Sequence, residues 1–135
     1  MTEYPRLLHT VLDTTDVRGL AEFYRELLGL RYRPGDEPPD GEDHADWLVL
    51  TDARGTRVLA FQEVASLTRT TWPADDVPMQ LHVDFTVTGV EALEANRERA
   101  LSLGAELIFD RTADPDEPLY VFADPSGHPF CIFVA

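Results

Sequence analysis

The feature that most constrains the fold is an internal repeat, because the second half of the chain follows the same plan as the first. In each half, an alternating apolar stretch that contains a histidine precedes a segment with helical spacing that ends at a glycine. Three more strand-like stretches follow in each half. The repeat predicts a β-α-β-β-β module used twice, and therefore an α+β protein. Corresponding positions lie 73 to 75 residues apart: His9 and His82, Val17 and Val90, Gly29 and Gly104.

The stretch Leu81–Val87 shows the strand pattern most clearly. Apolar residues alternate with His82, Asp84 and Thr86, and this period of two is typical of a strand with one face against a core. His82 and Asp84 share a face, about 7 Å apart along the strand. They are a candidate catalytic pair, with Asp84 as the base. The alternative is a satisfied interior histidine beside a carboxylate that is hydrogen-bonded to a neighbouring strand.

Local signals predict the remaining elements and their boundaries. We expect first strands at 7–13 and 81–87. One helix should run from a cap at Thr15 or Asp16 to Gly29, and a second should open at the capping-box sequence 88–91. The proline-rich acidic segment 36–46 reads as an exposed loop. These signals predict a first module at about residues 5–64, a linker at 65–79 and a second module at about 80–135.

Composition excludes several classes of function. The 135 residues carry a net charge of −14, which repels phosphate backbones and anionic lipids, so we expect neither nucleic-acid nor membrane binding. The single Cys131 cannot form an internal disulfide and fits a reducing compartment. No apolar run is long enough to cross a bilayer. We therefore expect a cytoplasmic protein.

The doubled module with a histidine in each first strand resembles the vicinal oxygen chelate superfamily. That superfamily includes glyoxalase I, extradiol dioxygenases, fosfomycin-resistance enzymes and bleomycin-resistance proteins. The best matching stretches are residues 7–12, 81–85 and 124–130, and together with Trp72-Pro73 they are most similar to its bacterial glyoxalase-like branch. The resemblance implies a curved mixed β-sheet around a central cavity and, by analogy, a homodimer.

The resemblance also implies a metal held by one residue from the first and last strand of each half. His9 and His82 match the first-strand positions, but the closing-strand positions fall on Ala60 and Cys131. Without a carboxylate there, the donor set suits nickel, manganese or iron poorly, although a zinc site that includes Cys131 is chemically possible. We therefore favour no cofactor, with a divalent metal (Zn, Fe, Mn or Ni) bound by His9 and His82 as the alternative.

Four residues are candidates for contact with a ligand: His9, Gln62, Trp72 and Cys131. Gln62 shares a strand face with Ala60 and alternatively satisfies a neighbouring backbone group. Trp72 either lids the pocket or packs against the sheet edge or a partner subunit. Cys131 between apolar neighbours is alternatively an inert buried side chain. His128, in the last turn, is expected to be exposed.

Together these observations predict a glyoxalase-like protein that binds a small, partly apolar ligand in the cavity of the curved sheet without a catalytic metal. His82 and Asp84 would carry any chemistry. The alternative function is a metal-dependent lyase, isomerase or dioxygenase of the vicinal oxygen chelate type that uses His9 and His82.

Overall fold

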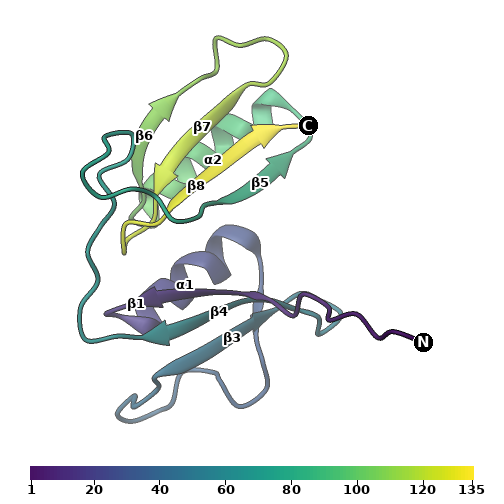
Figure 1. Cartoon of the computed structure of the whole chain (residues 1–135), viewed down its shortest axis with the longest axis vertical. Coiled ribbons are helices and arrows are strands. Elements are labelled where there is room, and N and C mark those ends of the chain that lie inside the picture. The colour runs from purple at the N-terminus through teal and green to yellow at the C-terminus, as the bar shows by residue number, and fades with distance from the viewer. The chain divides into compact units, whose positions relative to one another are not determined.

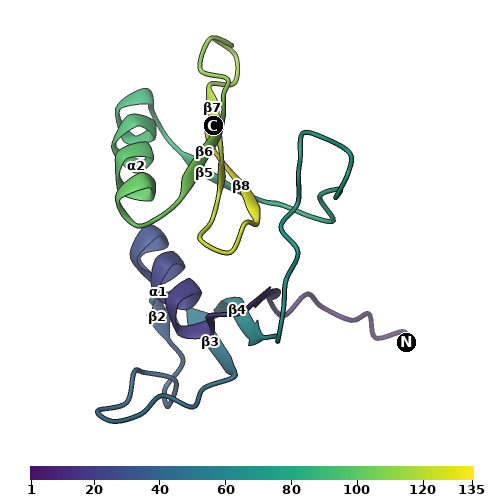
Figure 2. The same ribbon diagram turned by 90° about the vertical axis from the view of Figure 1, so that its left-hand side faces the viewer.

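The computed structural model describes residues 1–135, which form two compact units, Met1–Ser66 and Leu67–Ala135. We call these units the first and second module. Each has the element order β-α-β-β-β (Figures 1 and 2), so the predicted α+β class and the doubled module are confirmed. Residues 67–79, which we expected to form a linker, belong to the second unit. No helix combines the length and the apolar character that a bilayer crossing requires.

Both modules contain one helix and one four-stranded mixed sheet. In each sheet the first and last strands of the module pair in parallel, and the other neighbours are antiparallel. The strand orders are β1-β4-β3-β2 and β5-β8-β7-β6. The elements of the first module are β1 (Thr10–Thr14), α1 (Val17–Leu28), β2 (Arg31–Tyr32), β3 (Trp47–Thr51) and β4 (Arg57–Glu63). Those of the second are β5 (Val83–Val87), α2 (Val90–Ser102), β6 (Glu106–Asp110), β7 (Leu119–Ala123) and β8 (Pro129–Val134).

In the second module, α2 packs on one face of its sheet (Figure 2). Phe122 and Phe130 form the centre of this core, with stacked rings whose centroids are 5.1 Å apart. Tyr120 of β7 donates a hydrogen bond to Glu94 of α2 at 2.6 Å. Since successive strand residues point to opposite faces, the neighbouring Val121 points away from α2. The sheet therefore has a helix-covered face and a second face on which a site can be built.

The turns that precede the two closing strands use the same hydrogen bonds. The side chain of Asp52 accepts the backbone N–H groups two and four residues later, at 2.9 and 3.0 Å, and Asp124 does the same at the same two distances. Gly55 and Gly127 complete these turns with φ values of +82° and +97°, a region that favours glycine. The repeat read from the sequence is therefore present in the hydrogen bonds of the backbone.

The first strand of each module begins later than the alternating pattern predicts, at residue 10 rather than 7 and at residue 83 rather than 81. In the second module Val83 pairs with Phe130, and the residue before Phe130 is Pro129, which has no N–H to donate. In the first module the parallel pairing starts at Thr10 and Leu59, although β4 itself begins at Arg57. The apolar alternation therefore continues beyond the paired length. As a result, His9 and His82 lie immediately before their strands rather than within them.

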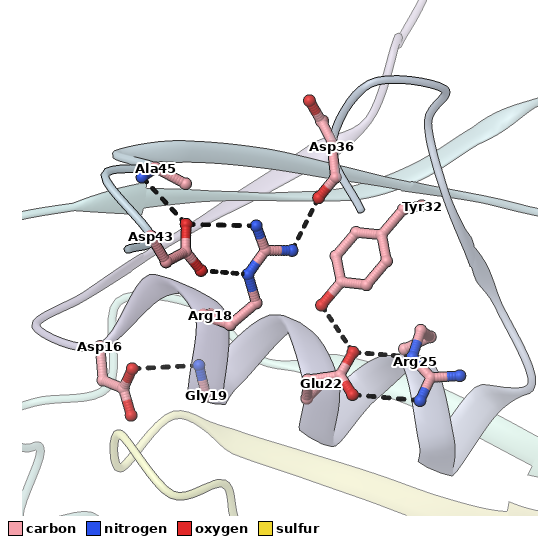
Figure 3. Close-up of polar contacts among 9 residues, drawn as sticks. All are labelled: Asp16, Arg18, Gly19, Glu22, Arg25, Tyr32, Asp36, Asp43 and Ala45. Carbon is pink, nitrogen blue, oxygen red and sulfur yellow. Dashed lines mark hydrogen bonds and ion pairs between the residues drawn. The ribbon is translucent and has the colours of Figure 1, made fainter. Parts of the chain in front are cut away.

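The acidic loop 36–46 is exposed, as predicted, but Arg18 of α1 binds it (Figure 3). The Nε of Arg18 donates to Asp43 at 2.6 Å, and its Nη1 donates to the carbonyl oxygen of Asp36 at 2.7 Å. The hydrogen bond from Arg18 holds the pKa of Asp43 below its ordinary value. The guanidinium also lies 4.9 Å from the centre of the Tyr32 ring. One polar residue on α1 thus fixes the course of a loop that has few apolar residues of its own.

The two helices begin in different ways. Oδ1 of Asp16 accepts the N–H of Gly19 at 3.0 Å, which confirms the predicted cap of α1. The capping box predicted for α2 is wrong, because the N-cap is Gly89 and no side chain caps the helix. Thr88 lies one residue too early for its hydroxyl to reach the first turn.

These caps predict different costs for two alanine substitutions. Asp16→Ala should lower the free energy of unfolding by about 1 kcal/mol, because it leaves a helix N–H group without its acceptor. Thr88→Ala should change it by much less. Urea denaturation followed by circular dichroism measures the free energy of unfolding of both variants. Equal losses would contradict the assignment of Asp16, and not Thr88, as a helix cap.

Candidate functional site

A row of side chains crosses all four strands of the second sheet on the face that points away from α2. The strand register pairs Asp84 with Cys131, Cys131 with Val121 and Val121 with Phe109. The ring of Trp72 stands edge-on to Phe109, with 5.5 Å between the centroids. In Figure 2, α2 and the segment 67–80 lie on opposite sides of this sheet. The row therefore runs from a polar end on β5 to an aromatic end on β6.

The polar end brings three of the predicted site residues together. Nε2 of His82 lies 3.4 Å from Oδ1 of Asp84, and the ligand atoms of His82, Asp84 and Cys131 all lie within 4.8 Å of one another. The side chains of His82 and Asp84 are 41% and 53% exposed, whereas Cys131 is half-buried. The cluster is accessible to a ligand and combines an imidazole, a carboxylate and a thiol.

The environment of Cys131 keeps its side chain protonated. Burial, followed by the charge of Asp84 and a hydrogen bond to it, raises the pKa of the Cys131 thiol to about 11. Arg111 lowers this pKa and Glu117 raises it, with smaller effects. At neutral pH the thiol can therefore donate a hydrogen bond to the Asp84 carboxylate. It is a weak nucleophile, because the thiolate is the reactive form.

The first module has the same backbone arrangement without the polar cluster. Val11 pairs in parallel with Ala60, as Asp84 pairs with Cys131 in the second module. Ala60 is fully buried, and neither side chain can bind a metal or a proton. His9 therefore lacks the neighbouring carboxylate and thiol that Asp84 and Cys131 provide for His82.

His9 and Gln62, two predicted ligand contacts, lie in the first module. His9 is half-buried, and its pKa is lowered by burial and then by the charges of Arg57 and Arg33. Its Nδ1 atom is buried and has no hydrogen-bond partner, and its ring centroid lies 6.0 Å from that of Trp47. Gln62 is exposed and pairs in register with Trp47. His9 is thus a neutral imidazole with one unused hydrogen-bonding atom.

Trp72, the remaining candidate, also borders a cavity of about 400 Å³ in the second module. The cavity lies between the segment 69–72 and the ends of β6 and β7, and the Arg69 guanidinium approaches the Glu106 carboxylate there at 3.6 Å. The sequence analysis did not identify Arg69 or Glu106, because neither residue lies in a motif that indicates a site. The cavity lining does not include the cluster of His82, Asp84 and Cys131. Its members are Arg69, Thr70, Thr71, Trp72, Glu106, Leu107, Ile108, Ala123 and Gly127.

The expectation that His128 is exposed is wrong. Its side chain is only 18% exposed, and its Nδ1 lies 2.8 Å from Oδ2 of Asp124, whose side chain is fully buried. A buried carboxylate requires hydrogen-bond partners for both oxygens. Backbone N–H groups bind Oδ1 of Asp124, and the His128 imidazole binds Oδ2. Thr56 occupies the corresponding position in the first module. No local pattern indicates this role, because the burial of Asp124 depends on packing.

Two mixed sheets built from β-α-β-β-β modules define the architecture of the vicinal oxygen chelate superfamily. A model of the glyoxalase-like domain family matches residues 9–133, and the chain belongs to this family. A search of curated proteins found no match.

Solved structures with the same fold cover nearly the whole chain. A glyoxalase/bleomycin resistance protein/dioxygenase family enzyme from Burkholderia phytofirmans is 16% identical, with a TM-score of 0.69 over 94% of this chain and 96% of that one. A possible glyoxalase from Bacillus cereus is 18% identical, with a TM-score of 0.64 over 94% and 96%. The fosfomycin resistance protein FosX from Listeria monocytogenes, complexed with Mn(II) and sulfate, is 18% identical, with a TM-score of 0.66 over 98% and 94%. Identities this low establish the fold and not the activity.

The environment of Cys131 predicts slow alkylation. Because its pKa of about 11 leaves little thiolate, the rate with iodoacetamide should be low at pH 7 and should still be rising at pH 9. Asp84→Asn removes a negative charge that opposes ionisation, so it should lower this pKa and speed the reaction at each pH. Mass spectrometry of timed samples measures the rate. Asp114→Asn, an exposed substitution in the same module, is the control, and an equal effect of both variants would contradict the role of Asp84.

Proposed function

We propose that the protein binds a small, partly apolar molecule along the row of the second sheet, with His82 and Asp84 holding its polar end. The main support is the 3.4 Å approach of His82 Nε2 to Asp84 Oδ1 on the face that points away from α2. This distance is longer than that of a charge-assisted hydrogen bond, at about 2.7–2.9 Å, so each group keeps bonding capacity for a ligand.

The rest of the row suits the apolar part of such a ligand. With neighbouring strands about 4.8 Å apart, the three steps from Asp84 to Phe109 span roughly 14 Å. Phe109 is 39% exposed although it is a large apolar side chain, and Trp72 lies beside it. A ligand with a polar head near Cys131 and a flat or aliphatic body towards Trp72 would cover the exposed Phe109 ring and pass over Val121, which is buried.

The polar end can also move a proton without a metal. Asp84 can accept an acidic proton from the ligand, and His82 can donate or accept at the adjacent position. For the first module, taken by itself, His9 and Gln62 stay proposed as ligand contacts, supported by the unused Nδ1 atom and by the exposed amide. The proposal also includes a homodimer, which sedimentation would test. It further includes a cytoplasmic location, which the single thiol suggests.

This proposal predicts that Asp84→Asn and His82→Ala weaken binding without unfolding the protein. The probe is a panel of small aromatic and aliphatic carbonyl compounds and carboxylic acids, followed by protein NMR. Loss of a hydrogen bond to a charged group should cost about 1.5–3 kcal/mol, or roughly 10–150-fold in Kd. Asp13→Asn and His44→Ala are matched controls from the first module. Binding that both site variants retain, or shifts confined to residues outside the row, would rule the proposal out.

A second candidate is a metal-dependent lyase, isomerase or dioxygenase that uses His9 and His82. Two observations favour it: the similar FosX protein is complexed with Mn(II), and a cluster of ligand-type side chains surrounds His82. His82 and Asp84 are donors that such a metal accepts, whereas Cys131 is softer than manganese prefers. A bound metal would act there as a Lewis acid on a ligand oxygen.

Removal of metal distinguishes the two candidates. If the ligand binds directly to His82 and Asp84, chelator-treated protein should bind the probe panel at least as tightly as untreated protein. The second candidate instead predicts that binding is lost on chelation, returns with Mn²⁺ and fails to return in His9→Ala. Isothermal titration of the treated and reconstituted protein provides the measurement.

A further inference from the structure

We propose that the second module contains a site for a zinc-class divalent cation, bound by His82, Asp84 and Cys131. These residues supply an imidazole nitrogen, a carboxylate oxygen and a sulfur atom, which are the three donor types that zinc binds in proteins. Three protein ligands leave one tetrahedral position for water or a substrate oxygen. The inference goes beyond the proposed function, because it needs no ligand and no residue of the first module.

The geometry of the cluster is close to what a tetrahedral ion requires. Bonds of about 2.0–2.3 Å to nitrogen, oxygen and sulfur place neighbouring ligand atoms roughly 3.3–3.6 Å apart. His82 Nε2 and Asp84 Oδ1 are already 3.4 Å apart, and no pair in the cluster exceeds 4.8 Å. Closure around an ion therefore needs movements of roughly 1 Å. The exposure of His82 and Asp84, at 41% and 53%, leaves both side chains room to make them.

The first module serves as an internal comparison. There the same parallel register joins Val11 and Ala60, so the fold itself requires neither an acid nor a thiol at these positions. In the second module both positions carry ligand-type side chains, and they are neighbours only because β5 and β8 pair. Metal coordination would use both of these side chains together with His82.

The proposed site also differs from the arrangement that the family resemblance implies. That arrangement takes ligands from both halves of the chain and includes the positions of His82 and Cys131. The site proposed here adds Asp84, lies within β5, β8 and the residue before β5, and uses no residue of the first module. A thiolate favours zinc, and its probes cobalt and cadmium, over manganese and magnesium. The net charge of −14 attracts cations in general but provides no such selectivity.

Zinc and a directly held ligand would use the same two side chains. Resting on the proposed function, this overlap implies that zinc competes with the ligand for His82 and Asp84. The metal-free and metal-loaded protein would then be two states of one site, and the free zinc concentration would set their proportion.

Cobalt titration of the chelator-treated full chain tests the proposal. The wild-type protein should bind one Co²⁺, with a thiolate-to-cobalt charge-transfer band that zinc abolishes by displacement. Cys131→Ser should remove the band. Asp84→Asn and His82→Ala should weaken cobalt binding by more than the roughly 10–100-fold that loss of an outer-shell partner costs. His44→Ala, which removes an exposed histidine, and His9→Ala should leave the cobalt affinity unchanged.

Several outcomes would overturn the proposal. These are a wild-type spectrum without a charge-transfer band, a band that survives Cys131→Ser, or a loss of cobalt in His9→Ala as large as in His82→Ala. If Cys131→Ser does not fold by circular dichroism, the wild-type band and its displacement by zinc decide the question. The probe panel, added to metal-free protein in parallel, tests the proposed ligand binding separately, so that either idea can fail without the other.

Discussion

The parallel pairing of the first and last strand within each module is the contact on which the rest of the structure depends. It joins the two ends of a β-α-β-β-β module, and the two intervening strands extend the sheet beyond the last strand, in the orders β1-β4-β3-β2 and β5-β8-β7-β6. In the second module it also makes Asp84 and Cys131 neighbours although a helix and two strands separate them in sequence. Without the pairing of β5 with β8, Asp84 and Cys131 would not be neighbours, and the cluster with His82 would not form.

The turn before β8 sets the register of that pairing. The buried carboxylate of Asp124 accepts two backbone N–H groups and the His128 ring, which fixes where β8 begins. A shift of one residue would turn Cys131 towards α2 and bring Phe130 to the opposite face, because side chains alternate along a strand. The residue that fixes the turn, Asp124, is therefore not the residue proposed to bind a ligand, Cys131, although the turn leads directly into β8. Asp124 sets the register of β8, and Cys131 supplies a thiol to the cluster.

Apart from the capping box of α2, the sequence predicted the features that have local signals and missed those that depend on distant partners. The repeat, the Asp16 cap and the Gly29 helix end follow from neighbouring residues, and the structure contains them. The late start of β5 could not be read from the alternation, because it depends on where β8 begins. The approach of Asp84 to Cys131 depends in the same way on register between strands.

The two modules share one backbone design and differ at the side chains that could carry chemistry. His9 and His82 occupy equivalent positions, yet His9 has a buried Nδ1 without a partner, whereas His82 is exposed and 3.4 Å from a carboxylate. Because the turn hydrogen bonds and the parallel register of the first and last strands are the same in both modules, this difference does not come from that part of the fold. It comes from Asp84 and Cys131 in place of an apolar pair. At these paired positions the second module has Asp84 and Cys131, which with His82 give three potential ligands, where the first module has Val11 and Ala60.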